Sequence, residues 1–184
     1  MPFTSNSTYG TVQYSTGTFY DQSKIIANDG ASLSSATLAT VSDLSIPVGG
    51  YERVQGIYTL WYDTDTTNEF SYKVANLAQS DGTTAVATTI VTHSLASIAL
   101  VKATNTPSAA NLECVTTYST DGAGEIIGVD SGISDAEALF LQVQFNAIIT
   151  ASTKGKISLQ VANITGSATG THLLAGSNVV YKKW

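Results

Sequence analysis

Residues 139–151 read Leu-Phe-Leu-Gln-Val-Gln-Phe-Asn-Ala-Ile-Ile-Thr-Ala, and this stretch decides the fold class. Its apolar residues recur at every second position, while Gln142, Gln144 and Asn146 lie largely opposite them. A period of two is the pattern of a β-strand, whereas a helix requires a period near 3.6. The capping-box match at Ser134–Glu137, just before this stretch, therefore predicts one helical turn at most.

Similar β-rich stretches occur along most of the chain and are separated by turn residues. In residues 51–62, apolar side chains occur on both faces, with Tyr58 and Tyr62 on one face and Ile57 and Trp61 on the other. This pattern predicts a strand that is covered on both sides. About eight to ten such strands with regular turn signals favour an antiparallel sandwich or barrel. The other expected strands are residues 37–46, 69–77, 85–92, 95–102, 112–118, 125–129, 157–161 and 178–184.

The length of 184 residues suits one domain, but residues 1–30 differ in composition from the rest. They contain no Leu, and their aromatic residues are spaced through Ser, Thr, Asn and Gly. One interpretation is a first strand with a frayed terminus. The other is an extended arm that docks on a partner through its rings, ahead of a folded body at residues 31–184. The aromatic residues of this predicted arm are Phe3, Tyr9, Tyr14, Phe19 and Tyr20.

The surface of the protein is expected to be polar but poor in charge. Charged residues make up 12% of the chain, and Ser, Thr, Asn and Gln fill the polar positions instead. The net charge is −6, and the eight Lys and Arg residues form no cluster along the sequence, which argues against binding to nucleic acid or an anionic membrane. A basic or neutral protein surface is the better expected partner. No apolar run reaches transmembrane length and the N-terminus is unlike a secretion signal, so we expect synthesis in a cytoplasm.

Residues that could carry chemistry are few and scattered. Cys114 is the single cysteine, and His93 and His172 have no neighbouring metal-ligand residues in the sequence, so His93 is interpreted as a loop or strand-end residue. Residues 63–69 look like a calcium loop but lack the Gly and Glu that an EF-hand requires at its sixth and twelfth positions. The acidic residues between 113 and 137 sit mostly at turn-like positions. We therefore predict no enzyme activity, no metal and no cofactor.

Two parts of the sequence resemble a known class of proteins. Residues 44–62 run Leu-Ser-Ile-Pro-Val-Gly-Gly-Tyr-Glu-Arg-Val-Gln-Gly-Ile-Tyr-Thr-Leu-Trp-Tyr, and residues 145–162 form a closing hairpin that precedes Gly176-Ser177 and a last strand. This pattern of strands and turns resembles that of tailed-phage accessory virion proteins with a tumour-necrosis-factor-like jelly roll, over roughly residues 37–184. Asn146-Ala147 departs from the pattern, because Gly is common at that bend.

The resemblance implies an antiparallel jelly-roll sandwich that forms a homotrimer. Such proteins serve as head decoration (cement) proteins or head fibres on the outer capsid of the virion, and they bind the major capsid protein, often through an N-terminal segment. On this hypothesis, Tyr58, Trp61 and Tyr62 are the expected trimer interface. The alternative function is a carbohydrate- or receptor-binding module of a tail fibre or a secreted protein.

Overall fold

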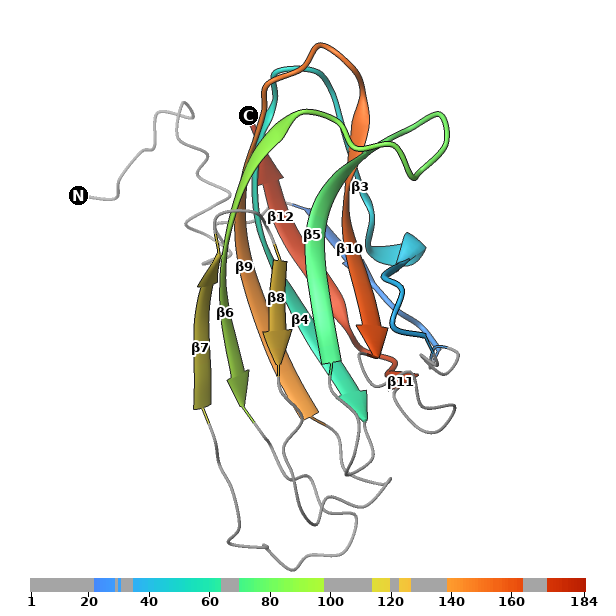
Figure 1. Ribbon diagram of the computed structural model, residues 1–184, viewed down its shortest axis with the longest axis vertical. Helices are drawn as coiled ribbons and strands as arrows, with labels where there is room; N and C mark the ends of the chain where they lie inside the picture. Colours follow the sequence, from blue (N-terminus) through green and yellow to red (C-terminus); the bar gives the residue numbers. More distant parts are fainter. Residues whose placement is uncertain are drawn as a thin grey trace, which may run out of the picture.

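The computed structural model (Figure 1) describes residues 22–28, 30, 35–63, 70–97, 114–119, 123–126, 139–163 and 172–184. Within these residues the chain forms twelve β-strands and one 3₁₀ turn, η2 (Ser42–Leu44), and contains no α-helix. The predicted all-β class is therefore confirmed.

The strands form two antiparallel sheets. The order of sheet A is β1 (Gln22–Ile25), β12 (Asn178–Lys183), β4 (Arg53–Asp63), β9 (Leu139–Ile149), β6 (Thr88–Ser97) and β7 (Cys114–Ser119), and β11 (His172–Leu173) also pairs with β4. The order of sheet B is β2 (Ala39–Thr40), β10 (Gly155–Asn163), β5 (Phe70–Ala78) and β8 (Ala123–Ile126), and β3 (Ile46–Val48) also pairs with β10. The jelly-roll path itself stays a prediction, because residues 64–69, 98–113 and 127–138 of its connections lie outside the described residues.

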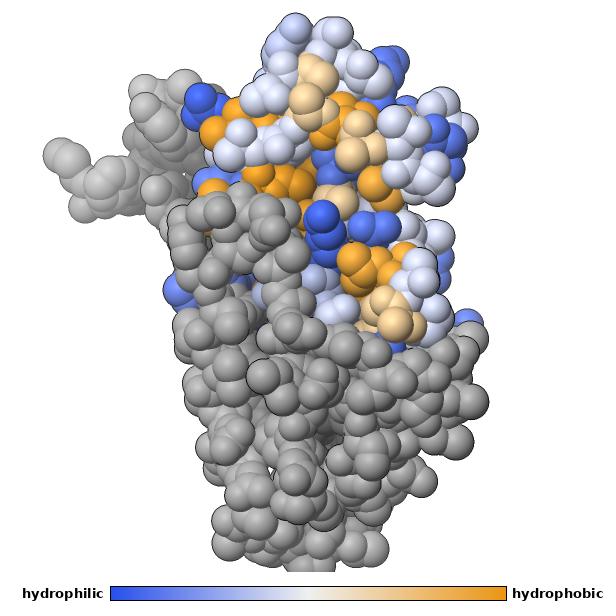
Figure 2. Space-filling model, viewed as in Figure 1, coloured by the Kyte–Doolittle hydropathy of each residue, from blue (hydrophilic) through white to orange (hydrophobic). Residues whose placement is uncertain are grey.

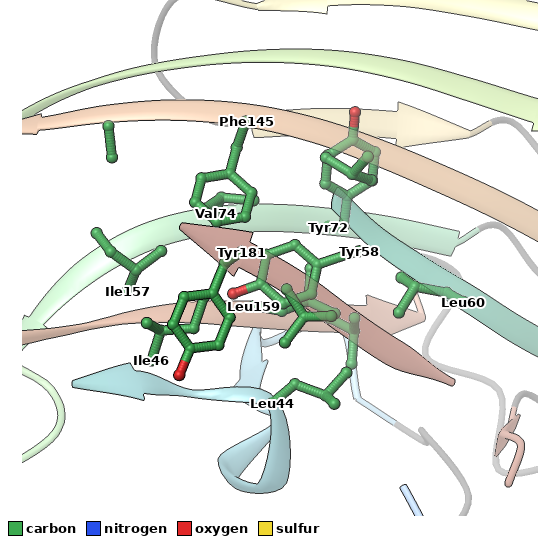
Figure 3. Packing of buried hydrophobic residues seen from close by; sticks show 14 of the residues in the cluster. Leu44, Ile46, Tyr58, Leu60, Tyr72, Val74, Phe145, Ile157, Leu159 and Tyr181 are labelled. Carbon is green, nitrogen blue, oxygen red and sulfur yellow. The ribbon is translucent and has the colours of Figure 1, made fainter. Parts of the chain in front are cut away.

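The inner faces of the two sheets enclose one apolar core (Figure 3). Alternate residues of β4 and β9 contribute from sheet A, and alternate residues of β5 and β10 contribute from sheet B. The rings of Tyr58 and Phe145 stack with their centroids 5.2 Å apart. The alternation read from residues 139–151 is confirmed, because its apolar set is buried: Leu141, Val143, Phe145, Ala147 and Ile149.

Gly56 makes room for the Phe145 ring in this core. It lies opposite Phe145 in the register of β4 and β9. A Cβ atom at position 56 would come within 2.6 Å of Phe145 Cε1 and 2.8 Å of the Val180 carbonyl oxygen. Contacts this short would force the ring or the backbone to shift, so the packing of Phe145 depends on the missing side chain of Gly56.

Two strands differ from their predicted limits. The break expected between residues 92 and 95 is wrong, because β6 runs without interruption through His93. Pro47, expected to end a strand, lies inside β3. A proline lacks the backbone N–H of a strand residue, but β3 pairs only with β10, so it is an edge strand that tolerates the loss.

The folded body starts before the predicted boundary at residue 31. β1 falls within the range assigned to the arm, yet it pairs with β12 over its whole length, from Gln22 opposite Tyr181 to Ile25 opposite Asn178. Lys24 Nζ donates a hydrogen bond to the carbonyl oxygen of Ser45, next to η2, and so links sheet A to the segment that enters sheet B. Residues 1–21, with all five predicted arm aromatics, lie outside the described part of the chain.

Candidate functional site

Two of the three residues predicted for a trimer interface belong to the core. Tyr58 is 0% exposed and Tyr62 is 4% exposed, so neither side chain can reach a partner, and the prediction is corrected for both. They occupy even positions of β4, which face sheet B. Burial, and for Tyr58 also the neighbouring Tyr181, raises the pKa of both hydroxyls above the usual value. Both phenols therefore stay neutral across the physiological pH range.

Trp61 lies on the other side of β4, where it is half-buried. Its backbone N–H donates to Ser177 Oγ at 2.9 Å, and its carbonyl oxygen accepts from the Leu174 N–H at 2.8 Å. The turn before β12 thus fixes Trp61 at the margin of the outer face of sheet A. Of the three predicted interface residues, Trp61 alone remains available for contact with another molecule.

We define the outer face of sheet A by twelve residues of its four central strands. Gln55, Gln144, Asn146 and His93 are exposed at its centre, and a shallow depression of about 130 Å³ lies among them. Lys182 is the one lysine of the set, and none of the twelve is Asp, Glu or Arg. The set consists of Gln55, Ile57, Thr59, Trp61, Val91, His93, Gln142, Gln144, Asn146, Asn178, Val180 and Lys182.

Apolar side chains cross this face between the amides. Ile57 lies between Gln144 of β9 and Val180 of β12 in the sheet register, and Val91 lies opposite Asn146. Ile57, Val91 and Val180 are half-buried. A surface with apolar residues, neutral amides and little charge costs less to remove from water than a charged one. We predicted that β4 is covered on both sides. Sheet B covers one side, and the described residues leave the other side open to another molecule.

A second unusual surface lies at the end of the sandwich near the C-terminus (Figure 1). Five of the eight Lys and Arg residues belong to three segments that meet there. No cluster was expected, because the cations are far apart in the sequence. Arg53 precedes Lys154 by about a hundred residues, and Lys156 precedes Lys182 by 26. The short Lys-x-Lys and Lys-Lys pairs near the end of the chain are the signal that could have found it. The five residues are Arg53, Lys154, Lys156, Lys182 and Lys183.

The described residues include no cluster suited to binding a metal ion. They contain no group of three or more His, Cys, Asp or Glu residues that could hold a metal ion. His93 lies within β6 rather than in a loop, His172 lies in β11 and Cys114 begins β7. Of the segment that looks like a calcium loop, residues 64–69 lie outside the described part, as do all but Glu125 of the acidic residues between 113 and 137.

A hollow of about 600 Å³ lies beside β5 and the segment that leads to β6. Figure 2 shows hydrophobic residues next to hydrophilic ones on this side of the molecule. Its lining includes Lys73, Asn76, Thr88, Ile90 and Gln160, and no His, Cys, Asp or Glu. Lys73 is the one titratable side chain in this lining, which also includes the hydroxyls of Thr83, Thr88 and Thr89.

No protein family, curated protein or solved structure matches the chain. A helix able to cross a membrane is likewise not found in the described part. The function of the chain is therefore inferred from the two surfaces described above.

Proposed function

We propose that this chain is a structural subunit that works by binding protein rather than by catalysis. Following the resemblance, we further propose that it forms a homotrimer, binds the major capsid protein and decorates the outside of a phage head, which it stabilises without a cofactor. The subunit would be made in the host cytoplasm and reach the virion by assembly. The observation that carries the proposal is the outer face of sheet A, which combines half-buried apolar residues with neutral amides.

The charge of this face supports contact between copies of the same chain. The chain carries a net charge of −6, so most pairs of its surfaces would repel one another. The outer face of sheet A carries no carboxylate, and its amides can both donate and accept hydrogen bonds. Four strands at a spacing of ~4.8 Å and seven residues at ~3.4 Å give a flat area of roughly 500 Å². Side-chain relief raises the accessible area toward the ~800 Å² that each partner buries in a standard interface.

Light scattering behind a sizing column tests the proposal. We expect the purified full chain to have a stable mass near that of three chains at micromolar concentration. A monomer at that concentration would contradict the proposal and favour the alternative, a carbohydrate- or receptor-binding module.

The predicted arm requires a separate test, for which the position of β1 gives a clean truncation point. Removal of residues 1–20 leaves Gln22–Ile25 intact, so the truncated chain should keep the melting temperature and the mass of the full chain. Loss of the aromatic anchors should abolish binding to empty heads in a co-sedimentation assay. Heads decorated equally well by both proteins would show that the arm is not the capsid contact.

A further inference from the structure

We propose that the end of the sandwich formed by residues 50–53, 151–156 and 182–184 binds an acidic peptide segment of a partner protein. This surface, called the basic end below, adjoins the outer face of sheet A and shares Lys182 with it. The inference rests on the proposed function only in expecting that the partner is a protein, and it does not require a trimer.

Backbone hydrogen bonds hold the three segments of the basic end side by side. Arg53 N–H donates to the Trp184 carbonyl oxygen at 3.0 Å, and Trp184 N–H returns the bond to Arg53 at 3.1 Å. Tyr51 N–H donates to the Ala151 carbonyl oxygen at 3.1 Å. Lys183 Nζ donates to the Pro47 carbonyl oxygen at 3.1 Å, and Lys156 lies opposite Pro47 in β10. The cations are therefore presented by a paired backbone rather than by a free tail.

The charge of the basic end is opposite to that of the rest of the chain. Its three segments contain five Lys or Arg residues and one acid, Glu52. The remainder of the chain contains three Lys residues and thirteen Asp or Glu residues. Oppositely charged surfaces steer association and fix orientation, so a partner that binds here is expected to be acidic.

The acidic turn of Asp81 lies beside the basic end, but its carboxylate is already bonded within the turn. Gln79 Nε2 donates to the Gly155 carbonyl oxygen at 3.1 Å and so places the turn of Asp81 beside the β9–β10 turn. The Asp81 carboxylate accepts hydrogen bonds from Thr84 Oγ1 at 2.6 Å and from the N–H groups of Thr83 and Thr84 at 2.8 and 2.9 Å. These bonds lower the pKa of Asp81 to about 2. Its oxygens are thus engaged within their own turn.

Exposed rings stand among the cations of the basic end. Tyr51 is 70% exposed and has a backbone φ of 62°, a left-handed conformation that is strained for a residue other than glycine. Trp184 is 54% exposed, and Ile148, opposite Arg53, is 39% exposed. A solvent-exposed ring at a strained position does not stabilise the fold, which points to a role in binding. Trp, Tyr and Arg are also the residues that dominate protein-binding hot spots.

The combination of rings and cations favours an acidic peptide over other anions. Nucleic acid and sulfated glycans carry dense charge, which the net −6 of the chain repels. A peptide that alternates acidic with apolar residues can place carboxylates on Arg53 and Lys154 and an apolar side chain on Tyr51 or Trp184. Tyr51 and Trp184 also define the clearest test, because their rings distinguish this mode from charge attraction alone.

The probe is a fluorescein-labelled peptide of alternating Glu and Phe, titrated with the full chain and followed by fluorescence anisotropy. We expect saturable binding that weakens about tenfold in the double variant Arg53→Gln/Lys154→Gln, whose residues are both exposed. Tyr51→Gly should weaken binding about fivefold or more without lowering the melting temperature, because glycine favours the φ of this position. The matched control Lys73→Gln removes a charge from the middle of β5 and should leave the affinity within about twofold.

Three results would overturn the inference: no saturable binding by the full chain, equal affinity in the wild type and the basic-end variants, or tighter binding of a heparin fragment than of the peptide. The last result would identify a site for anionic glycans instead. The mass of each variant, measured in parallel, separates this test from that of the proposed function, since loss of peptide binding at unchanged mass concerns the basic end alone.

Discussion

Replacement of Phe145 with alanine should lower the free energy of unfolding by about 3–5 kcal/mol. The ring is 2% exposed, stacks on Tyr58 and fills the space left by Gly56, so its removal opens a cavity that two rigid strands cannot close. Domains of this size have a total stability of ~5–15 kcal/mol, so the variant should melt roughly 10 °C below the wild type. Urea unfolding followed by far-ultraviolet circular dichroism measures the change.

Tyr58→Phe is the matched control for this substitution. The Tyr58 hydroxyl is buried and has no hydrogen-bond partner within the described residues, so its removal breaks no bond while the ring is kept. The free energy of unfolding should therefore change by less than about 1 kcal/mol, with stabilisation the favoured sign. A cost equal to that of Phe145→Ala would show that the hydroxyl, and not ring packing, stabilises this part of the core.

Ile57→Lys should convert the assembled protein to monomers. Ile57 lies in the middle of the outer face of sheet A, between Val180 and Gln144. A lysine there places like charges beside one another when the outer faces of three copies meet around the threefold axis, at a cost of several kcal/mol. We expect the dissociation constant of the assembly to rise at least about a hundredfold. Light scattering across a dilution series measures this change.

The control for Ile57→Lys is Ala75→Lys on sheet B. Ala75 is also a half-buried apolar residue in the middle of a strand, and it points away from the core because its neighbour Val74 points into it. This variant should keep the mass of the wild type. An Ile57→Lys protein that is folded and still has the mass of three chains would exclude the outer face of sheet A as the contact.

The periodicity of long strands made much of the fold predictable. β9 was expected at residues 139–151 and spans Leu139–Ile149, and β4 was expected at 51–62 and spans Arg53–Asp63. Short edge strands were less accessible to this reasoning. β1 contains a lysine, β3 contains a proline, and neither sequence alternates clearly between polar and apolar residues. These strands form because β1 pairs with β12 and β3 pairs with β10. Such tertiary pairing is not visible in local sequence.

The surfaces were less predictable than the core. Tyr58 and Tyr62 are good interface residues by type, but their positions in β4 turn them inward, and the apolar residues of the outer face on the same strand are Ile57 and Trp61. The cluster of cations at the basic end was not predicted for a different reason. Arg53 is separated by more than a hundred residues from Lys182 and Lys183, and only the pairing of β4 with β12 brings them together.

The position of β12 between β1 and β4 has a consequence for synthesis on the ribosome. Residues 178–183 form a central strand of sheet A. The sheet therefore cannot be completed until nearly the whole described chain has left the exit tunnel. Until then, β4 exposes one backbone edge and much of its apolar inner face, which invites pairing with other nascent chains. We therefore expect sheet A to be completed only once residues 178–183 have left the tunnel, and a chain stalled before residue 178 to aggregate.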